Sequence, residues 1–413
     1  MTPQTQGVRT SRPSGARSPA LSTTAATLLF AAAAFTLFYR HSHSGLELRD
    51  FRDGVYYAVV ALLDGGNPYD TPHYLQRYPV EQGYSPYAPG FLALHLPFGL
   101  LSFETAQAVY FAFVCGLGVV LAYLAWRYTS QQSNLAVSLV MAAALLLSRP
   151  GSWNAGLGQY ALEFSIGVTL ALCLAPRHIW LAGFGCGLTL LKPTYGVPMS
   201  LLLLGSGRTR IWLVGVAFAA LLSLAPAFAV VRAAGGIEPF ATSLRASLAN
   251  FSSDTTAAAA TGPERIDIIG LVGFALGANP SPALELALTA AVLAAGTYGL
   301  RRLVVATNGE VTPLALVLAC LTLLICTYHQ TYDLVLLLVP LTAWTTVVRW
   351  PTTRRIGTLT LFALLLFPML NYLSPQAVQV HLGIHGLASS LLTRANAVTM
   401  AARRQTTQPR SSR

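Results

Sequence analysis

Apolar runs long enough to cross a lipid bilayer alternate with short polar segments along almost the whole chain. A helix needs roughly 20 apolar residues to cross a hydrocarbon layer about 30 Å thick. Runs near this length predict membrane-spanning helices at Leu21–Tyr39, Thr105–Trp126, Ser133–Ser148, Tyr160–Ala175, Ile211–Val231, Ala283–Leu303, Thr312–Tyr328, Asp333–Val348 and Ile356–Tyr372. Ile179–Leu204 and Ala377–Thr393 are ambiguous, and Tyr87–Leu101, with its two prolines, is expected to lie at the membrane or dip into it. The pattern predicts an all-α integral membrane protein with about ten or eleven transmembrane helices.

The composition supports this assignment and excludes other classes of protein. Of the 413 residues, 54% are hydrophobic and only 10% are charged, whereas soluble chains carry about 25% charged residues. The net charge of +11 comes from arginines in the gaps between apolar runs, which is typical of cytoplasmic membrane loops. The five cysteines lie inside apolar runs at no disulfide or zinc-binding spacing. We therefore expect no nucleic-acid partner, no metal and no cofactor.

The basic residues predict the orientation of the chain in the membrane. With the N-terminus in the cytoplasm, alternating spans put these arginines inside: Arg127, Arg177, Arg208, Arg210, Arg301, Arg302, Arg349, Arg354 and Arg355. This requires Ile179–Leu204 to enter and leave on the same side, as two half-helices broken at Lys192-Pro193, because proline interrupts a helix. Among the cytoplasmic segments only Glu310 is then acidic. We expect a multi-pass plasma-membrane protein with an extracytoplasmic active site.

The chain divides into one membrane domain with a basic tail at each end. Residues 1–20 form the first cytoplasmic tail, 21–393 a single transmembrane domain, and 394–413 the second cytoplasmic tail. Within the domain, 40–104 forms an extracytoplasmic loop that we expect to be catalytic, and 232–282 forms an extracytoplasmic flap. The arginines before the first apolar run resemble a signal peptide, but the length of that run favours an uncleaved span.

The loop after the first span carries the densest polar block of the chain. A short helix is expected over Phe51–Leu63, ended by a pair of glycines. Asp50 is then either the N-cap of this helix, with Asp53 as its capping-box partner, or a general base that takes a proton from a sugar hydroxyl. The two roles are compatible. Arg52 and Asp53 could orient an acceptor or balance the charge of Asp50.

Tyrosines follow in the same loop. The segment Tyr84–Gly90 is expected to be extended before its prolines. Tyr84 and Tyr87 are therefore either an interfacial tyrosine belt or one wall of a cleft for a sugar or lipid.

Lys192 is the only lysine of the chain and lies between two apolar half-helices. A charge inside a span costs roughly 2.5–3.5 kcal/mol and is usually functional, although a lysine at a helix end can also extend to the interface. The proline break favours a tip that reaches an anionic group such as a lipid phosphate. His329 is either an interfacial residue or a phosphate ligand, and Asp333 either caps the next helix or joins the site.

Short motifs occur in order across most of the chain: Asp50-Phe51, Tyr56-Tyr57-Ala58, Gly66-Asn67-Pro68-Tyr69, Tyr84-Ser85-Pro86, Gly158-Gln159, Lys192-Pro193 and Tyr332-Asp333. In this ordered set the chain resembles the polyprenol-phosphate-mannose-dependent α-mannosyltransferases, glycosyltransferase family 87, a multi-spanning group with the GT-C fold. The resemblance implies inverting transfer from a polyprenyl-phosphate sugar on the extracytoplasmic face, without a nucleotide sugar. It implies that Asp50 is the base and that Lys192 and His329 lie near the donor phosphate.

We therefore expect a membrane hexosyltransferase that moves a hexose, with mannose favoured, from a polyprenyl-phosphate donor to a glycolipid or glycan acceptor. Substrate-binding roles are expected for Arg52, Asp53, Tyr84, Tyr87, Gln159 and Tyr332. The alternative is a multi-spanning transporter or lipid flippase, supported by Glu163 and Glu285, which lie in or near spans. A non-catalytic membrane scaffold is the third interpretation.

Overall fold

The computed structural model describes residues 22–44, 48–130, 134–174, 178–253 and 265–347. Within these ranges the regular structure is helical, and the β-pairing consists of one isolated bridge between Arg265 and Gln330. The predicted all-α membrane fold is confirmed by this architecture together with the four long apolar helices described next. The predicted span Ile356–Tyr372 and the ambiguous segment Ala377–Thr393 lie outside the described residues.

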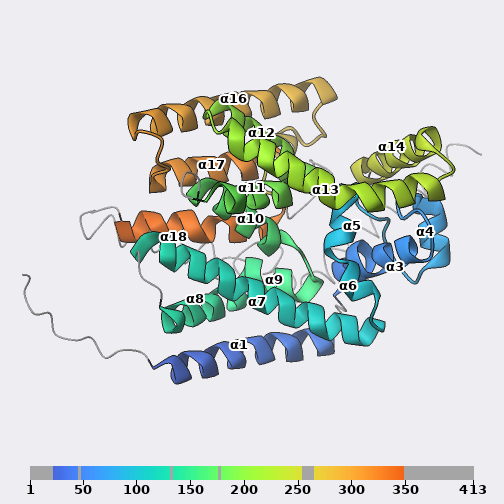
Figure 1. Ribbon diagram of the computed structural model, residues 1–413, viewed down its shortest axis with the longest axis horizontal. Coiled ribbons are helices and arrows are strands. Elements are labelled where there is room, and N and C mark those ends of the chain that lie inside the picture. Colours follow the sequence, from blue (N-terminus) through green and yellow to red (C-terminus); the bar gives the residue numbers. More distant parts are fainter. Residues whose placement is uncertain (1–21, 45–47, 131–133, 175–177, 254–264, 348–413) are drawn as a thin grey trace, which may run out of the picture.

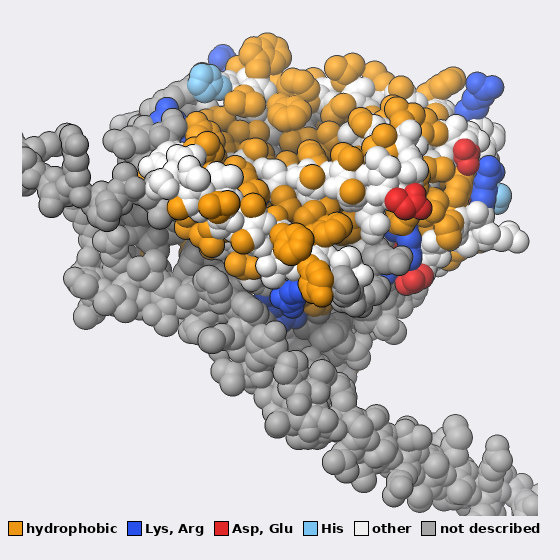
Figure 2. All heavy atoms as spheres, turned by 90° about the horizontal axis from the view of Figure 1, so that it is seen from below, with side chains coloured by type: hydrophobic (Ala, Val, Ile, Leu, Met, Phe, Trp, Pro, Cys, Tyr) orange, Lys and Arg blue, Asp and Glu red, His pale blue; other side chains and the backbone are white. Residues whose placement is uncertain are grey.

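Four of the described helices are long and apolar enough to cross a membrane: α1 (Thr23–Ser44), α7 (Phe103–Ser130), α13 (Thr209–Ala233) and α16 (Pro282–Ala306). They run roughly along the long axis of the molecule (Figure 1). On the side where α1 lies, hydrophobic side chains cover the middle of the surface and charged side chains gather toward its two ends (Figure 2). An apolar belt between two charged rims suits a bilayer, whose core excludes charge and whose surfaces accept it.

The other apolar helices are too short to cross a bilayer alone. Helices α10 (Ala161–Cys173), α11 (Ile179–Leu190), α12 (Pro193–Gly205) and α17 (Pro313–Cys326) have 12 to 14 residues each. At 1.5 Å per residue they extend about 20 Å, against a hydrocarbon layer of about 30 Å. If one end of each lies at a membrane surface, the other end lies inside the layer that the long helices cross.

These short helices form three pairs that turn back in the middle of the molecule (Figure 1). The first pair consists of α8 (Leu135–Leu147) and α10. The short helix α9 (Arg149–Leu157) joins them and is bent by 77° relative to α8. In the second, α11 and α12 meet at Leu191-Lys192, so the predicted break at Lys192-Pro193 is present. The third pair consists of α17 and α18 (Leu338–Val347), which are joined by the 3₁₀ helix η2 (Thr331–Leu337).

The turning points of the three pairs are hydrogen-bonded to one another. The Thr327 hydroxyl donates to the carbonyl oxygen of Thr194 at 2.9 Å, which joins the third pair to the second. The Asn154 side-chain amide donates to the carbonyl oxygen of Tyr332 at 2.9 Å, which joins the first pair to the third. A polar group buried in an apolar interior must find such a partner, so these bonds fix the tips as one unit.

The opposite ends of the helices are also tied together. The Arg208 guanidinium donates to the carbonyl oxygens of Leu172 at 3.0 Å and Gly309 at 2.9 Å. The Tyr128 hydroxyl donates to the carbonyl oxygen of Val311 at 2.5 Å. The connections after α7, α10, α12 and α16 therefore share one end of the molecule, called the far end below.

The loop after α1 covers the turning points and holds the segments α2 (Arg49–Phe51), the π-helical turn η1 (Arg52–Tyr56), α3 (Tyr57–Leu63), α4 (Thr71–Arg77), α5 (Gly90–Leu94) and α6 (Leu96–Gly99). The predicted helix over Phe51–Leu63 is thus present, and Tyr87–Leu101 contains two short helices. Helix α14 (Ile237–Ser253) packs on this loop through the Ser247 hydroxyl, which donates to the carbonyl oxygen of Tyr84 at 3.1 Å. Helix α15 (Ile268–Leu276) follows it.

Gly158, at the end of α9, lets the first pair approach the loop closely. Its φ is +71°, which favours glycine, and a Cβ there would lie 2.5 Å from the Cβ of Phe51. Gly65 has a similar φ of +73° but has open space around it. A comparison of alanine substitutions at the two positions therefore distinguishes the cost of backbone strain from the cost of steric overlap.

We predict that Gly158→Ala destabilises the protein more than Gly65→Ala. Gly65→Ala carries only the strain of a left-handed residue, about 1–2 kcal/mol, whereas Gly158→Ala adds overpacking of a further 1–3 kcal/mol or so. Unfolding of the two variants in mixed detergent micelles measures the difference. Equal losses of stability would mean that α9 can move away from Phe51 freely.

Candidate active site

The three turning points and the covering loop enclose a cavity of about 400 Å³. Five of the residues that the sequence predicted for the site line it: Asp50, Tyr87, Gln159, Lys192 and Tyr332. The structure therefore brings together residues from four separate parts of the chain. The other four predicted residues, Arg52, Asp53, Tyr84 and His329, are not in its wall.

Asp50 lies in the first turn of α2 and is only 8% exposed. The Gln82 amide donates to its Oδ1 at 2.8 Å, and the Gln159 amide donates to its Oδ2. Arg49 Nε lies 3.6 Å from Oδ1. The interpretation of Asp50 as a helix N-cap was wrong, because Leu48, in a left-handed conformation, occupies that position. The carboxylate is therefore directed at side chains of the cavity.

The surroundings of Asp50 change its acidity. Burial raises the pKa of this carboxyl above its ordinary value of 3.8, and it outweighs the charge of Arg49 and the two amide hydrogen bonds, which lower the pKa. Asp53 adds a smaller upward contribution. Loss of hydration disfavours a buried charge, whereas hydrogen bonds to the carboxylate favour it. The two amides therefore favour the ionised carboxylate and oppose part of the effect of burial.

Asp53 holds the loop and does not reach the cavity. Its side chain is fully buried, and Arg52 Nε donates to Oδ1 at 2.6 Å. The backbone N–H groups of Glu81 and Gln82 donate to Oδ2 at 3.0 and 3.2 Å. Because both carboxylate oxygens accept hydrogen bonds from protein donors, Asp53 positions the backbone of Gln82, whose side chain in turn holds Asp50.

Gln159 reaches Asp50 because of the glycine before it. Gly158 brings the end of α9 against Phe51, and Phe51 directly follows Asp50 in α2. The Gln159 carbonyl oxygen, Oε1, is buried with no hydrogen-bond partner among the described residues. One end of this amide is thus fixed on Asp50, and the other end is a buried acceptor.

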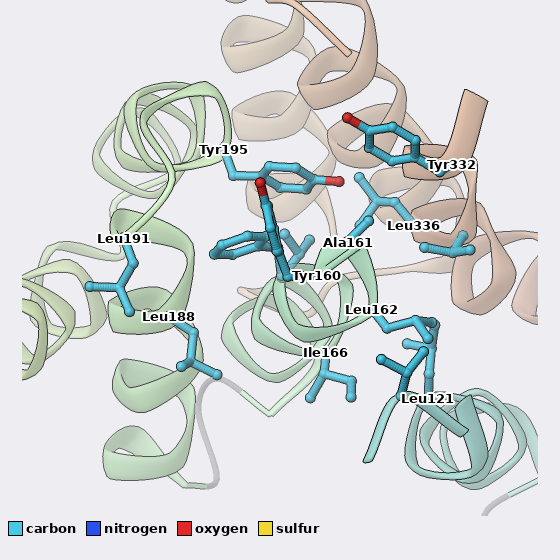
Figure 3. Close-up of a cluster of buried hydrophobic side chains, with 14 of the residues drawn as sticks. Leu121, Tyr160, Ala161, Leu162, Ile166, Leu188, Leu191, Tyr195, Tyr332 and Leu336 are labelled. Atoms are coloured by element: carbon cyan, nitrogen blue, oxygen red, sulfur yellow. The ribbon is translucent and has the colours of Figure 1, made fainter. Parts of the chain in front are cut away.

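Lys192, the residue before α12, is 5% exposed and lies among aromatic rings. The centroids of four rings lie 5.0 to 5.9 Å from its Nζ: those of Tyr160, Phe164, Tyr195 and Tyr332. The electron-rich face of an aromatic ring attracts a cation. Figure 3 shows Tyr160, Tyr195 and Tyr332 close together, at the start of α10, on α12 and on η2. The turning points of all three pairs thus surround the lysine.

Asp333 is the nearest carboxylate to Lys192. Its Oδ1 lies 3.4 Å from Lys192 Nζ and accepts a hydrogen bond from the Tyr195 hydroxyl at 2.9 Å. Its Oδ2 accepts from the backbone N–H of Gln330 at 3.0 Å, as part of a capping box on η2. The N-cap of η2 is thus Gln330 and not Asp333, which is its capping-box partner at the third helical position and also balances the charge of the lysine.

His329 and Tyr84 lie behind the cavity wall. The His329 ring packs edge-on against Tyr195 at 4.8 Å between centroids, and its Nδ1 bonds the carbonyl oxygen of Thr327 at 3.0 Å. Tyr84 packs edge-on against Tyr69 at 5.0 Å. Arg52 is occupied by Asp53 and by Glu81. These three side chains are engaged by other residues and do not line the cavity. We therefore interpret them as supports of its wall.

Several cavity residues carry no signal in the sequence. Gln82 lies in an irregular stretch without a motif, and Tyr160 and Thr194 merely adjoin the motifs Gly158-Gln159 and Lys192-Pro193. The Tyr160 hydroxyl is 2.6 Å from that of Tyr87. For Tyr160 and Thr194, the adjacent motif is the only signal in the sequence that could have indicated a role in the cavity.

The acidic residues that supported a transporter have local partners. Glu163 is buried, and its Oε1 lies 3.1 Å from His95 Nε2, while His95 Nδ1 bonds the carbonyl oxygen of Phe91. Glu285 lies in the first turn of α16, where an acidic residue complements the helix dipole. Within the described ranges no three His, Cys, Asp or Glu side chains gather as they would around a metal ion.

Fold and cavity together define a polytopic helical membrane protein in which a buried carboxylate and a buried lysine line one cavity. The sequence profile of glycosyltransferase family 87 matches residues 86–327, more than half of the chain. The chain belongs to this family and is therefore a membrane glycosyltransferase. The match includes Tyr87, Gln159 and Lys192, whereas Asp50 and Tyr332 lie outside it. No curated protein and no solved structure matches the chain.

We predict that Asp53→Asn destabilises the protein by about 3 kcal/mol, because it leaves the partly buried Arg52 and two backbone donors without their carboxylate. Glu81→Gln is the matched control, since Glu81 binds the same arginine with a side chain that is 68% exposed, and it should cost less than about 1 kcal/mol. Unfolding in mixed micelles compares the two. Similar small losses would show that Asp53 does not hold the loop.

Proposed function

We propose that the protein transfers a hexose, with mannose favoured, from a polyprenyl-phosphate sugar to a glycolipid or glycan, with inversion and on the extracytoplasmic face. The observation that carries this proposal is the cavity itself, in which Asp50, held by two amides, and Lys192 face the same enclosed space. A base and a cation in one cavity suit the two partners of a sugar transfer, an acceptor hydroxyl and a departing phosphate.

In the proposed reaction Asp50 takes the proton of the acceptor hydroxyl as its oxygen forms a bond to the anomeric carbon. The bond from that carbon to the phosphate oxygen breaks on the opposite face, which inverts the configuration. The phosphate leaves with the negative charge, next to Lys192. In this proposal Tyr195 and Asp333 hold the lysine in place, and His329 acts through Tyr195, on which it packs.

The remaining predicted residues divide between wall and support. Tyr87 and Tyr332 form aromatic walls, and Gln159 is a polar residue of the lining that suits a sugar hydroxyl. Arg52 and Asp53 hold the segment that carries Gln82, and Tyr84 connects that segment to α14. In the proposal these three therefore affect substrates only through the shape of the cavity.

A lipid-borne donor suits the depth of the cavity. Helix α11 extends about 18 Å from its start to Lys192, which is less than the thickness of the hydrocarbon layer. If α11 starts at one membrane surface, Lys192 at its other end lies inside the hydrocarbon layer, short of the opposite surface. A phosphate carried by a membrane lipid can approach such a cation from within the bilayer, whereas a free nucleotide sugar would have to leave water to reach it.

Charge distribution supports the proposed sidedness. The described part of the far end carries Arg127, Arg208, Arg210, Arg301 and Arg302, with Glu310 as its acidic residue. Cytoplasmic loops are enriched in arginine and lysine. We therefore place the far end and the N-terminus in the cytoplasm, and the covering loop outside the cell membrane.

We predict that Asp50→Asn lowers sugar transfer by about 10² to 10⁴-fold, the usual contribution of a general base. Lys192→Met, which keeps length without charge, should raise the KM for the donor. The assay follows radiolabelled polyprenyl-phosphate mannose in membranes that contain each variant. Asp64→Asn is the control, because Asp64 forms an exposed ion pair with Arg77. Transfer that survives Asp50→Asn would remove Asp50 as the base.

We also predict a specific pH dependence. Transfer requires ionised Asp50, so its rate should fall as the pH drops through the pKa of that carboxyl, which burial raises. Gln82→Leu removes a hydrogen bond that lowers this pKa. The acidic limb of the pH profile of kcat/KM should therefore move to higher pH in Gln82→Leu. A shift to lower pH, or no shift, would show that the acidic limb does not report the ionisation of Asp50.

A further inference from the structure

One wall of the cavity has no part in the reaction described above. Trp153 and Leu157 both line the cavity and lie four residues apart on α9. Residues at this spacing share one face of a helix. Helix α9 therefore presents an apolar face with one indole ring to the enclosed space.

The helix that carries this face ends next to the proposed base. Helix α9 ends at Gly158, whose close approach to Phe51 puts the helix end against α2. Asp50 is the residue before Phe51, and Gln159, directly after Gly158, donates to Asp50. The helix that carries the apolar face therefore ends beside Asp50, and both the face and Asp50 line the same cavity.

Neighbouring contacts hold the indole ring in place. The Arg149 guanidinium lies 5.3 Å from the centroid of the Trp153 ring, an attractive cation–π contact. Asn154, the next residue, is fully buried and donates to the carbonyl oxygens of Pro150 at 2.8 Å and Tyr332 at 2.9 Å. These bonds fix the rotation of α9, so Trp153 forms a partly exposed and ordered platform.

The chemistry around the platform suits a sugar ring. A pyranose packs the C–H bonds of one face against an aromatic ring while its hydroxyls bond to a few polar groups, the usual mixture in a binding pocket. Gln82, Gln159 and Thr194 supply polar side chains to the same lining. The chain of a polyprenol offers these side chains no hydrogen-bond partner, whereas the hydroxyls of a sugar do.

We propose that Trp153 is the platform on which the pyranose ring of the acceptor stacks, so that the acceptor hydroxyl beside Asp50 belongs to a sugar. The inference rests on the proposed function, because Trp153 is assigned to the acceptor through its helix, which ends at Gly158 next to the Gln159 that donates to Asp50. Trp153 thereby selects sugar-bearing acceptors over a peptide hydroxyl or a polyprenol.

The test uses the full-length protein in phospholipid nanodiscs, with octyl α-D-mannopyranoside as the acceptor probe and polyprenyl-phosphate mannose as the donor. Trp153→Leu removes the ring but stays apolar and should raise the KM for the octyl mannoside about 10-fold or more. The donor KM should change less than about two-fold. Trp153→Phe keeps an aromatic face and should restore most of the affinity. Trp180→Leu, at a ring 71% exposed on α11, is the matched control.

Direct binding of the octyl mannoside without donor, followed by saturation-transfer NMR, separates this inference from the proposed function. Binding that weakens in Trp153→Leu supports the platform even if the wild-type protein transfers nothing from polyprenyl phosphate, a result that would overturn the proposed donor alone. Unchanged binding and KM in Trp153→Leu would overturn the platform. An equal rise in the donor KM and the acceptor KM would also overturn it, because Trp153 would then affect both substrates through the shape of the cavity.

Discussion

The rest of the site depends on one buried carboxylate, that of Asp50. A carboxylate removed from water is stable only if protein donors replace the lost hydration, and here the amides of Gln82 and Gln159 do so from segments far apart in the chain. Each amide is held by a further contact: Asp53 fixes the backbone at Gln82, and Gly158 lets Gln159 approach. The covering loop and the first helix pair are thereby fixed relative to each other.

The second constraint is the length of the helices. Three pairs of helices, too short to cross a bilayer alone, bring their turning points together under the covering loop, and the polar groups at those points satisfy one another. Non-helical backbone at membrane depth is stable only when it is buried in protein or lines a wet cavity. The same constraint explains how Lys192 can stay buried, between Asp333 and a set of aromatic rings.

Local signals predicted the fold well and the site only in part. Apolar run length and the proline after Lys192 are local properties, so the long helices and the broken pair could be predicted from the sequence. Side-chain direction depends on tertiary contacts, so the same reasoning placed Tyr84 and His329 in a cavity that they do not line, because they pack on Tyr69 and Tyr195 instead. Gln82 could not be found, because a glutamine in an irregular stretch carries no pattern.

The central claim is that Asp50 and Lys192 serve one reaction from two sides of a single cavity. A cryo-electron microscopy structure of the full-length protein in nanodiscs with a bound polyprenyl phosphate tests it most directly. The account predicts density for the phosphate in contact with Lys192 Nζ, inside the cavity that Asp50 lines. A phosphate bound instead at the far-end arginines, with the cavity empty, would contradict it.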